Sequence, residues 1–196
     1  RVIQVTTFLI SPAMIFLSVL AGPLFHALLP EKWLPAVPYL QLMCIAGIMY
    51  PLHLINLNIL QVKGRSDFLL YLEIIKKLLI VIILLISYHY GVIGILIGQI
   101  ISSVIAYIPN SYFADRLINY SVREQMADFL PSLALSGAVG MLIYTASHFI
   151  RWPAFAQIIA FSSTAGILYV AGAHLLKLEA YVFAKQLVTD RMSGRG

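Results

Sequence analysis

Six long apolar runs constrain this sequence more than any other feature. The hydrocarbon core of a bilayer is about 30 Å thick, so a helix needs roughly 20 apolar residues to cross it. Backbone polar groups in lipid must be paired within their own segment, and runs such as LLIVIILLI do not alternate as barrel strands do. We therefore expect an all-α, polytopic membrane bundle with six transmembrane helices, at about residues 5–29, 36–60, 68–88, 92–113, 129–150 and 154–176.

The composition excludes several other classes of protein. Of the 196 residues, 61% are hydrophobic and 11% are charged, whereas about a quarter of a soluble domain is charged. A secreted disulfide scaffold, a disordered tail and an ordinary cytosolic enzyme are therefore excluded. Cys44 is the single cysteine, so the sequence offers no disulfide framework. Because the chain begins with Arg1 rather than Met, we expect it to be a fragment of a larger protein.

The distribution of Lys and Arg predicts which way the spans face. Of the 13 Lys and Arg residues, only Lys32 and Arg151 fall on one side of the expected membrane. Cytoplasmic loops carry such an excess of positive charge, so we expect both termini to be cytoplasmic. The net charge of +5 then reflects membrane topology, and no nucleic-acid partner is expected. We expect a six-helix lobe over residues 1–176 and a cytoplasmic amphipathic tail over residues 177–196.

The third expected span carries three charged residues, Glu73, Lys76 and Lys77. If the span began after Lys77, only 11 residues would remain, which reach about 16 Å and cannot cross the bilayer. The charges therefore lie within or just below the membrane, and their i, i+3, i+4 spacing places them on one helical face. They could form a cationic cytoplasmic vestibule for an anionic head group. Alternatively, both lysines extend to the lipid head groups while Glu73 pairs with Lys77.

The second and fourth spans also carry polar residues. Pro51 predicts a kink in the second span, where Asn56 and Asn58 point about 200° apart in a straight helix and cannot face one cavity. A polar stripe on the fourth span could line a pathway or bond to a neighbouring helix. Its members are Gln99, Ser102, Ser103 and Asn110.

Small residues on the fourth and fifth spans predict close helix packing. Gly94 and Gly98 have the small-xxx-small spacing that lets another helix approach, and Ser132, Ser136 and Gly140 repeat it on the fifth span. The sequence carries no Gly-rich phosphate loop, nucleophile elbow or metal-ligand spacing of His and carboxylate. We therefore expect no catalysis, no cofactor and no metal.

Two stretches resemble a known family. Residues 56–77, NLNILQVKGRSDFLLYLEIIKK, and residues 91–121, GVIGILIGQIISSVIAYIPNSYFADRLINYS, resemble polysaccharide exporters of the Wzx type. These belong to the MOP superfamily, with the MATE drug exporters and the lipid II flippases. The resemblance covers about residues 40–145, and the remaining spans fit in number and orientation.

The resemblance implies a transporter of two lobes, related by pseudo-symmetry about the membrane normal, in the bacterial cytoplasmic (inner) membrane. Its substrate would be an undecaprenyl-pyrophosphate-linked oligosaccharide, moved from the cytoplasmic to the outer leaflet of the lipid bilayer by alternating access. This chain would be the C-terminal lobe, and its missing N-terminal lobe would be a partner. Alone, it would transport only by pairing with another copy or with that missing half.

The resemblance also implies roles for residues. Lys76, with Lys63 and Arg65 near the cytoplasmic mouth, would attract the pyrophosphate, and Glu73 would pair with these cations or couple to an ion or proton. Gln99, Ser103 and Asn110 would offer hydrogen bonds to sugars. The complete candidate substrate-binding set is Asn56, Lys63, Arg65, Glu73, Lys76, Lys77, Gln99, Ser103 and Asn110.

Other functions stay open at the level of sequence. A cation-coupled drug exporter of the same superfamily would favour acidic residues in the cavity, where the sequence places only Glu73. A membrane scaffold could instead recruit glycan-assembly enzymes through basic cytoplasmic loops. A membrane-embedded glycosyltransferase or ligase is disfavoured, because the sequence lacks an acidic pair and a large outer loop.

Overall fold

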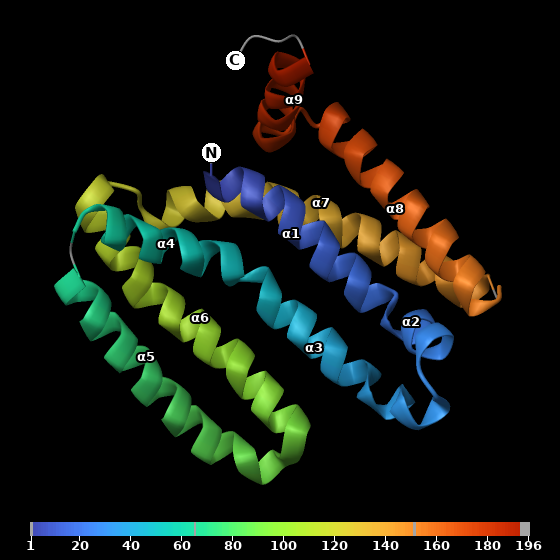
Figure 1. Cartoon of the computed structure of the whole chain (residues 1–196), viewed down its shortest axis with the longest axis horizontal. Coiled ribbons are helices and arrows are strands. Elements are labelled where there is room, and N and C mark those ends of the chain that lie inside the picture. Colours follow the sequence, from blue (N-terminus) through green and yellow to red (C-terminus); the bar gives the residue numbers. More distant parts are fainter. Residues whose placement is uncertain (1, 65, 151, 193–196) are drawn as a thin grey trace. The chain divides into compact units, whose positions relative to one another are not determined.

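The described secondary structure is helical throughout. The computed structural model describes residues 2–64, 66–150 and 152–192. Its elements are α-helices and 3₁₀-helices (η), drawn in Figure 1, as the all-α prediction requires. In chain order they are α1 (Val2–Val19), α2 (Ala21–Leu28), η1 (Glu31–Ala36), α3 (Val37–Ile48), α4 (Tyr50–Val62), α5 (Ser66–Ser87), η2 (Tyr88–Tyr90), α6 (Gly91–Ile118), α7 (Val122–Phe149), α8 (Ala154–Leu175) and α9 (Glu179–Met192).

The chain divides into two compact units. The first combines residues 1–37 with residues 128–196, and so contains α1, α2, most of α7, α8 and α9. The second covers residues 38–127 and contains α3 to α6 with the first residues of α7. Helix α5 packs against α6, and α4 packs against both. The second unit therefore brings together the expected second, third and fourth spans.

Each of the first two expected spans is divided into two helices. Helix α1 ends at Val19 and α2 begins at Ala21, just before Gly22 and Pro23. Helix α3 ends at Ile48 and α4 begins at Tyr50, so the kink predicted from Pro51 is confirmed as a break. Proline lacks the amide hydrogen, and its ring clashes with the carbonyl one turn earlier, so a helix must bend or stop there.

The loop expected between the fourth and fifth spans is much shorter than predicted. The separator expected from Asp115 to Asp128 is helical at both ends, since α6 continues to Ile118 and α7 begins at Val122. Asn119, at φ 51°, ends α6, and its N–H donates to the carbonyl of Asp115 at 2.8 Å. The Ser121 N–H then donates to the Glu124 carboxylate at 2.8 Å, and the Glu124 N–H donates to the Ser121 hydroxyl at 3.3 Å. This reciprocal capping box was readable as S-x-x-E and starts α7.

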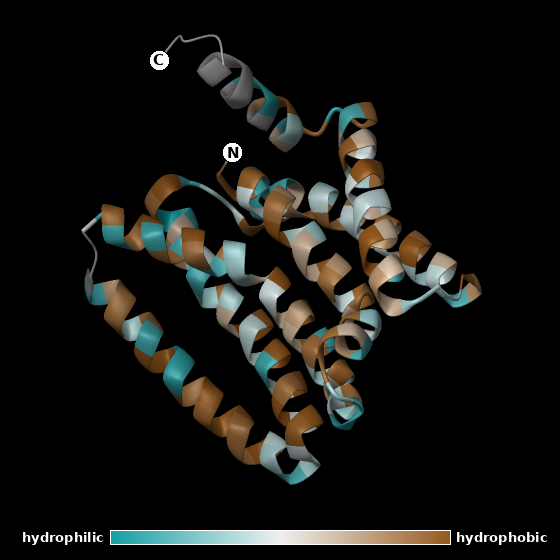
Figure 2. Ribbon diagram, turned by 45° about the vertical axis from the view of Figure 1, so that its right-hand side comes forward, coloured by the Kyte–Doolittle hydropathy of each residue, from teal (hydrophilic) through white to brown (hydrophobic). Residues whose placement is uncertain are grey.

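Within the described residues, four segments have the length and apolar composition of a membrane span: Val2–Val19, Glu31–Val62, Val122–Phe149 and Ala154–Leu175. Helices α5 and α6 cover the third and fourth expected spans but are not among these four. The first half of α5 carries charged residues, which appear as teal bands on an otherwise brown helix in Figure 2. The six-span arrangement therefore stays a prediction.

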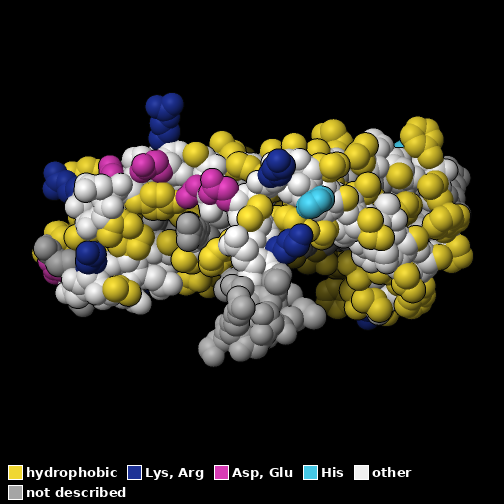
Figure 3. Space-filling view, turned by 90° about the horizontal axis from the view of Figure 1, so that it is seen from above, with side chains coloured by type: hydrophobic (Ala, Val, Ile, Leu, Met, Phe, Trp, Pro, Cys, Tyr) yellow, Lys and Arg dark blue, Asp and Glu magenta, His cyan; other side chains and the backbone are white. Residues whose placement is uncertain are grey.

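Apolar side chains cover much of the face shown in Figure 3. On α5, for example, Leu70, Leu85 and Ile86 are each more than 60% exposed. Soluble monomers rarely expose contiguous apolar patches of more than a few hundred Å². An outward-facing aliphatic surface is what a helix in contact with lipid tails requires.

The first unit has a core of its own. One cluster joins Leu20, Val139 and Phe161, and a second joins Phe8, Tyr169 and Ala180. The Tyr169 hydroxyl donates to the Phe8 carbonyl at 3.0 Å, which satisfies a buried phenol. The buried Ala180 belongs to the expected tail, so α9 is packed on the first unit rather than extending α8.

Helix α9 is separated from α8 by a sharp turn. Lys177 has φ 50°, which ends α8, and α9 starts at Glu179. Its carboxylate accepts a hydrogen bond from the Gln4 amide at 2.8 Å, and the same amide donates to Asp128 at 2.8 Å. The sequence predicts an apolar side of this tail formed by Tyr181, Ala184, Leu187 and Val188. Tyr181 is described, and its ring contacts Phe8. The side chains of Ala184, Leu187 and Val188 lie outside the described part of the chain.

Candidate functional site

Three helices of the second unit line a small, open cavity of mixed polarity. Its volume is about 230 Å³. One polar residue comes from α4, a lysine from α5 and most of the hydrogen-bonding groups from α6. The lining residues are His53, Lys76, Leu79, Ile80, Gln99, Ser102, Ser103 and Ala106.

Lys76 supplies the positive charge of this cavity. Its side chain is only 15% exposed, and its ammonium contacts the carboxylate of Glu73 at 2.5 Å, one helical turn earlier. The Glu73 side chain is 42% exposed. A lysine ammonium has three donors, so the contact with Glu73 leaves donors for a second partner. The pair lowers the cost of placing one charge among apolar helices.

His53 connects α4 to α6 through both ring nitrogens. The Asn110 amide nitrogen lies 3.1 Å from Nδ1, and the Ser103 hydroxyl oxygen lies 2.9 Å from Nε2. An amide NH₂ only donates, so Nδ1 is the acceptor and the neutral ring carries its proton on Nε2. That proton is donated to the Ser103 oxygen. The hydroxyl hydrogen of Ser103 is then available to an acceptor in the cavity.

The cavity wall therefore combines one cation with neutral hydrogen-bonding groups. Gln99 is exposed and offers both an amide donor and an acceptor, while the Ser102 hydroxyl is used by the Gln99 carbonyl at 2.9 Å. Such a wall suits a ligand that has an anionic group beside hydroxyls. Among the described residues, no group of three His, Cys, Asp or Glu side chains could hold a metal ion.

A second polar network in the same unit is largely buried. Gln125 accepts hydrogen bonds from the Asn56 amide and the Tyr107 hydroxyl, each at 3.0 Å, and donates to the Tyr120 carbonyl at 3.0 Å. Asn56 and Gln125 are both 0% exposed. This network hydrogen-bonds the start of α7 to α4 and α6, so its role is to stabilise the packing of these helices.

The structure brings together part of the predicted substrate-binding set. Lys76, Gln99 and Ser103 line the cavity, Glu73 holds Lys76, and Asn110 reaches it through His53. The other members are placed elsewhere. Lys63 and Lys77 are exposed and do not line the cavity, Asn56 is in the buried network, and Arg65 lies outside the described residues.

The expectation that the charges of α5 act together needs a correction. Glu73 pairs with Lys76 rather than with Lys77, and the two lysines project in different directions because successive helical residues are about 100° apart. Asn56 is likewise no wall residue, because Gln125 takes its amide donor. Contact of either residue with a substrate stays a prediction.

Sequence reasoning did not assign His53 and Gln125 to any site. His53 is a polar residue in a mostly apolar run, and such a residue needs a partner inside the membrane. The polar stripe of the fourth span offered such partners, so the sequence could have predicted that His53 contacts it. Gln125 gave no comparable signal, because its expected place was a solvent-exposed loop.

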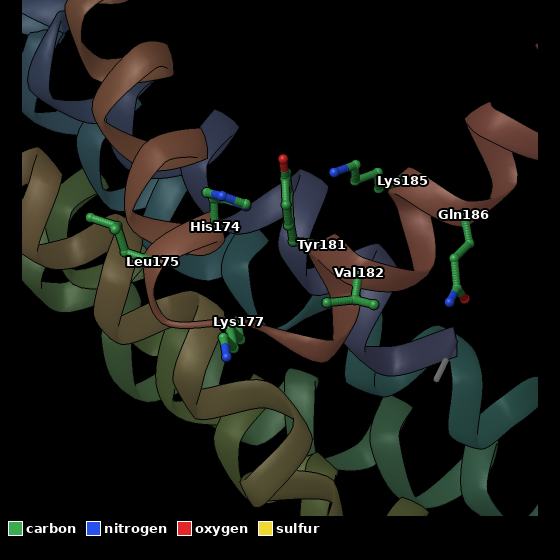
Figure 4. Close-up of a pocket in the computed structure, with 7 residues that line it drawn as sticks. All are labelled: His174, Leu175, Lys177, Tyr181, Val182, Lys185 and Gln186. Atoms are coloured by element: carbon green, nitrogen blue, oxygen red, sulfur yellow. The ribbon is translucent and has the colours of Figure 1, made fainter.

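Another cavity lies where α8 meets α9. It has a volume of about 560 Å³ and is lined by side chains from the end of α8, the turn and α9 (Figure 4). The rings of His174 and Tyr181 contact each other there, with centroids 5.6 Å apart. Lys177 and Lys185 make it cationic, which suits the charge of an anionic membrane surface. None of its lining residues belongs to the predicted substrate-binding set.

Comparison with known proteins gives one relevant similarity. A stretch of 114 residues, 58% of this chain, is 27% identical to a Klebsiella pneumoniae protein described as an uncharacterized membrane protein in the cps region. The match spans 24% of that relative, so this chain corresponds to about a quarter of its length. No protein-family model matches the chain, and no solved structure matches it. The similarity and the apolar helices together indicate a membrane protein related to one from a capsule polysaccharide region.

Proposed function

We propose that this chain forms one lobe of a flippase that moves lipid-linked oligosaccharide across the bacterial cytoplasmic membrane by alternating access. The observation that carries the proposal is the cavity of the second unit, where Lys76 stands beside neutral hydrogen-bonding groups among apolar helices. A lipid-linked oligosaccharide presents the same combination, a phosphate next to sugar hydroxyls. The location of the Klebsiella relative in a cps region supports a polysaccharide substrate.

The cavity size suits one part of a large substrate. Complete small-molecule sites measure roughly 300–1,000 Å³, whereas this cavity measures about 230 Å³. In the proposed mechanism Lys76 attracts the pyrophosphate, while Gln99 and Ser103 bond to the first sugar. The rest of the glycan occupies the space that this lobe shares with its partner lobe.

Glu73 has a defined role in this mechanism. A single charge in a membrane helix costs about 2.5–3.5 kcal/mol, so the Glu73 carboxylate stabilises Lys76 when no substrate is bound. An arriving phosphate replaces that carboxylate, and Glu73, already 42% exposed, turns to water. Release of the substrate restores the pair. Lys76 therefore has an anionic partner in both states.

The test compares two adjacent lysines. The protein, in the form in which its own host makes it, is expressed in bacteria that lack their capsule repeat-unit exporter, and surface polysaccharide is measured. We expect Lys76→Ala to reduce export by at least 10-fold, while Lys77→Ala stays within 2-fold of wild type at equal membrane abundance. The double variant Glu73→Gln with Lys76→Gln removes both charges and keeps the site neutral, so it separates loss of the cation from misfolding.

Each other outcome counts against the proposal. Normal export by the folded Lys76→Ala variant would exclude the cationic head-group site. Absence of export by correctly inserted wild-type protein, in hosts that supply several different repeat units, would exclude the flippase. Drug efflux by that protein would then indicate a cation-coupled exporter. Capture of glycan-assembly enzymes by it would indicate a scaffold.

A further inference from the structure

A second cavity lies along the same pair of helices, α5 and α6. Its volume is about 480 Å³, and its walls are strongly apolar. The described lining carries no charged residue. Most of it consists of five isoleucines: Ile83, Ile86, Ile93, Ile97 and Ile101.

Two glycines of α6 create this groove. A methyl group added at Gly98 would lie 2.9 Å from the Cγ2 atom of Ile83, and one added at Gly94 would lie 2.7 Å from the Ser87 carbonyl oxygen. Helix α5 can therefore lie close to α6 only because these positions lack a side chain. Because Gly94 and Gly98 have no side chains, the neighbouring isoleucines form the walls of a groove around them.

The apolar groove continues the polar cavity. On α5, Ile80 of the polar cavity is one turn before Ile83 of the groove. On α6, Gln99 and Ser102 of the polar cavity directly neighbour Gly98 and Ile101 of the groove. The two cavities thus follow one another along one helix pair, which Figure 1 shows running side by side.

The polarity along this pair has a direction. The cationic end, at Lys76, is nearer the loop after α4, and the isoleucine end is nearer η2. The excess of positive charge predicts that the loop after α4 is cytoplasmic. Ten residues separate Lys76 from Ile86, which is about 15 Å of helix and half of the roughly 30 Å hydrocarbon core. A lipid in the cytoplasmic leaflet has the same order and reach, with its head outward and its tail toward the midplane.

We propose that the α5–α6 groove holds the hydrocarbon tail of a phosphate-bearing lipid from the cytoplasmic leaflet, with its phosphate at Lys76. The inference rests on the proposed function and adds a tail subsite to it. Lys76 provides charge complementarity at one end, and the isoleucine walls match a saturated or isoprenoid chain at the other. The groove thereby admits lipid-linked substrate and excludes free, water-soluble oligosaccharide.

The experiment measures binding without transport. The purified protein is placed in phosphatidylcholine nanodiscs with a polyprenyl phosphate that carries a photoreactive group in its tail, and the labelled peptides are mapped after illumination. Labelling is expected on residues 83–101. Ile97→Trp fills the groove and should reduce labelling at least 5-fold, whereas Ile105→Trp should leave it unchanged. Both isoleucines are 43% exposed on α6, and Ile105 lines neither cavity.

A second probe tests the link between the two ends. The corresponding polyprenol, which has the same tail but no phosphate, should label the groove at least 5-fold less and be insensitive to Lys76→Ala. Equal labelling in Ile97→Trp and Ile105→Trp, or labelling confined to other helices, would overturn the tail subsite. Cross-links between two copies through residues 83–101 would show that a second chain occupies the groove instead.

The binding result is independent of the proposed function. Specific labelling in a protein that exports no polysaccharide would support the lipid site and exclude the flippase function. Export that survives Ile97→Trp without loss would remove the tail subsite and leave the flippase.

Discussion

Individual polar side chains in this protein are held by partners on other helices. His53 is the main example, because it bonds Ser103 and Asn110 through its two ring nitrogens. Asn110 is 0% exposed, and its side-chain amide oxygen (Oδ1) has no partner among the described residues. Removing its bond to His53 would leave the whole amide unpaired. A buried, unpaired polar group costs about 1–3 kcal/mol.

We predict that His53→Ala lowers the stability of the second unit by about 1–2 kcal/mol, in line with buried polar groups in membrane proteins. His89→Ala is the matched control, because His89 is exposed in η2 and should change stability little. Thermal unfolding in detergent would measure both variants. Equal melting temperatures for the two variants would show that the His53 network contributes nothing to stability.

At the scale of helices, small residues decide how closely neighbours approach. Gly140 of α7 faces Ile15 of α1, and a methyl group added there would lie 2.4 Å from the Ile15 Cγ2 atom. Gly137, one turn earlier on α7, has no neighbour within 4 Å of the same position. The two glycines therefore separate the effect of packing from the effect of helix propensity.

We predict opposite effects for alanine at these positions. Gly140→Ala should destabilise the first unit by about 1–3 kcal/mol through overpacking. Gly137→Ala should be neutral or stabilise it by up to about 1 kcal/mol, because alanine is the better helix former. Ile15→Ala combined with Gly140→Ala should recover part of the loss. Chemical unfolding curves would measure all three, and similar values for both single variants would contradict the close contact.

At the scale of the whole molecule, the main question is whether α5 and α6 cross the membrane. Six crossings place η2 on the side opposite the loop after α4 and the loop before α7. If only the four segments Val2–Val19, Glu31–Val62, Val122–Phe149 and Ala154–Leu175 cross, all three places lie on one side. The cationic cavity and the isoleucine groove have their proposed meaning only with six crossings.

We predict six crossings, testable by cysteine labelling. Cys44→Ala removes the single native cysteine, which is 3% exposed, and gives a clean background. Single cysteines are then introduced to report the side of the membrane at the loop after α4 (Lys63→Cys), at η2 (His89→Cys) and at the start of α7 (Arg123→Cys). In intact spheroplasts an impermeant maleimide should label only His89→Cys, and the other two should be labelled after permeabilisation. Labelling of all three, or of none, in intact spheroplasts would exclude the six-span lobe.

The sequence by itself determined the helical class, the approximate places of most helices and the break at Pro51. Each of these follows from local physics: an apolar run of sufficient length, the missing amide of proline and turn residues between runs. The capping box of Ser121 and Glu124 was equally local, and recognising it would have predicted the start of α7.

The tertiary structure alone decided which polar side chains meet. It turned Lys76 into the cavity and Lys77 away from it, joined His53 to Ser103 and Asn110, and placed Asn56 with Gln125. Such pairs depend on the rotation of each helix about its axis and on its register against its neighbours. Helical periodicity predicts which residues share a face of one helix, but it does not predict which face of the neighbouring helix they will meet. Packing between the helices decides that, so the site exists only in the assembled unit.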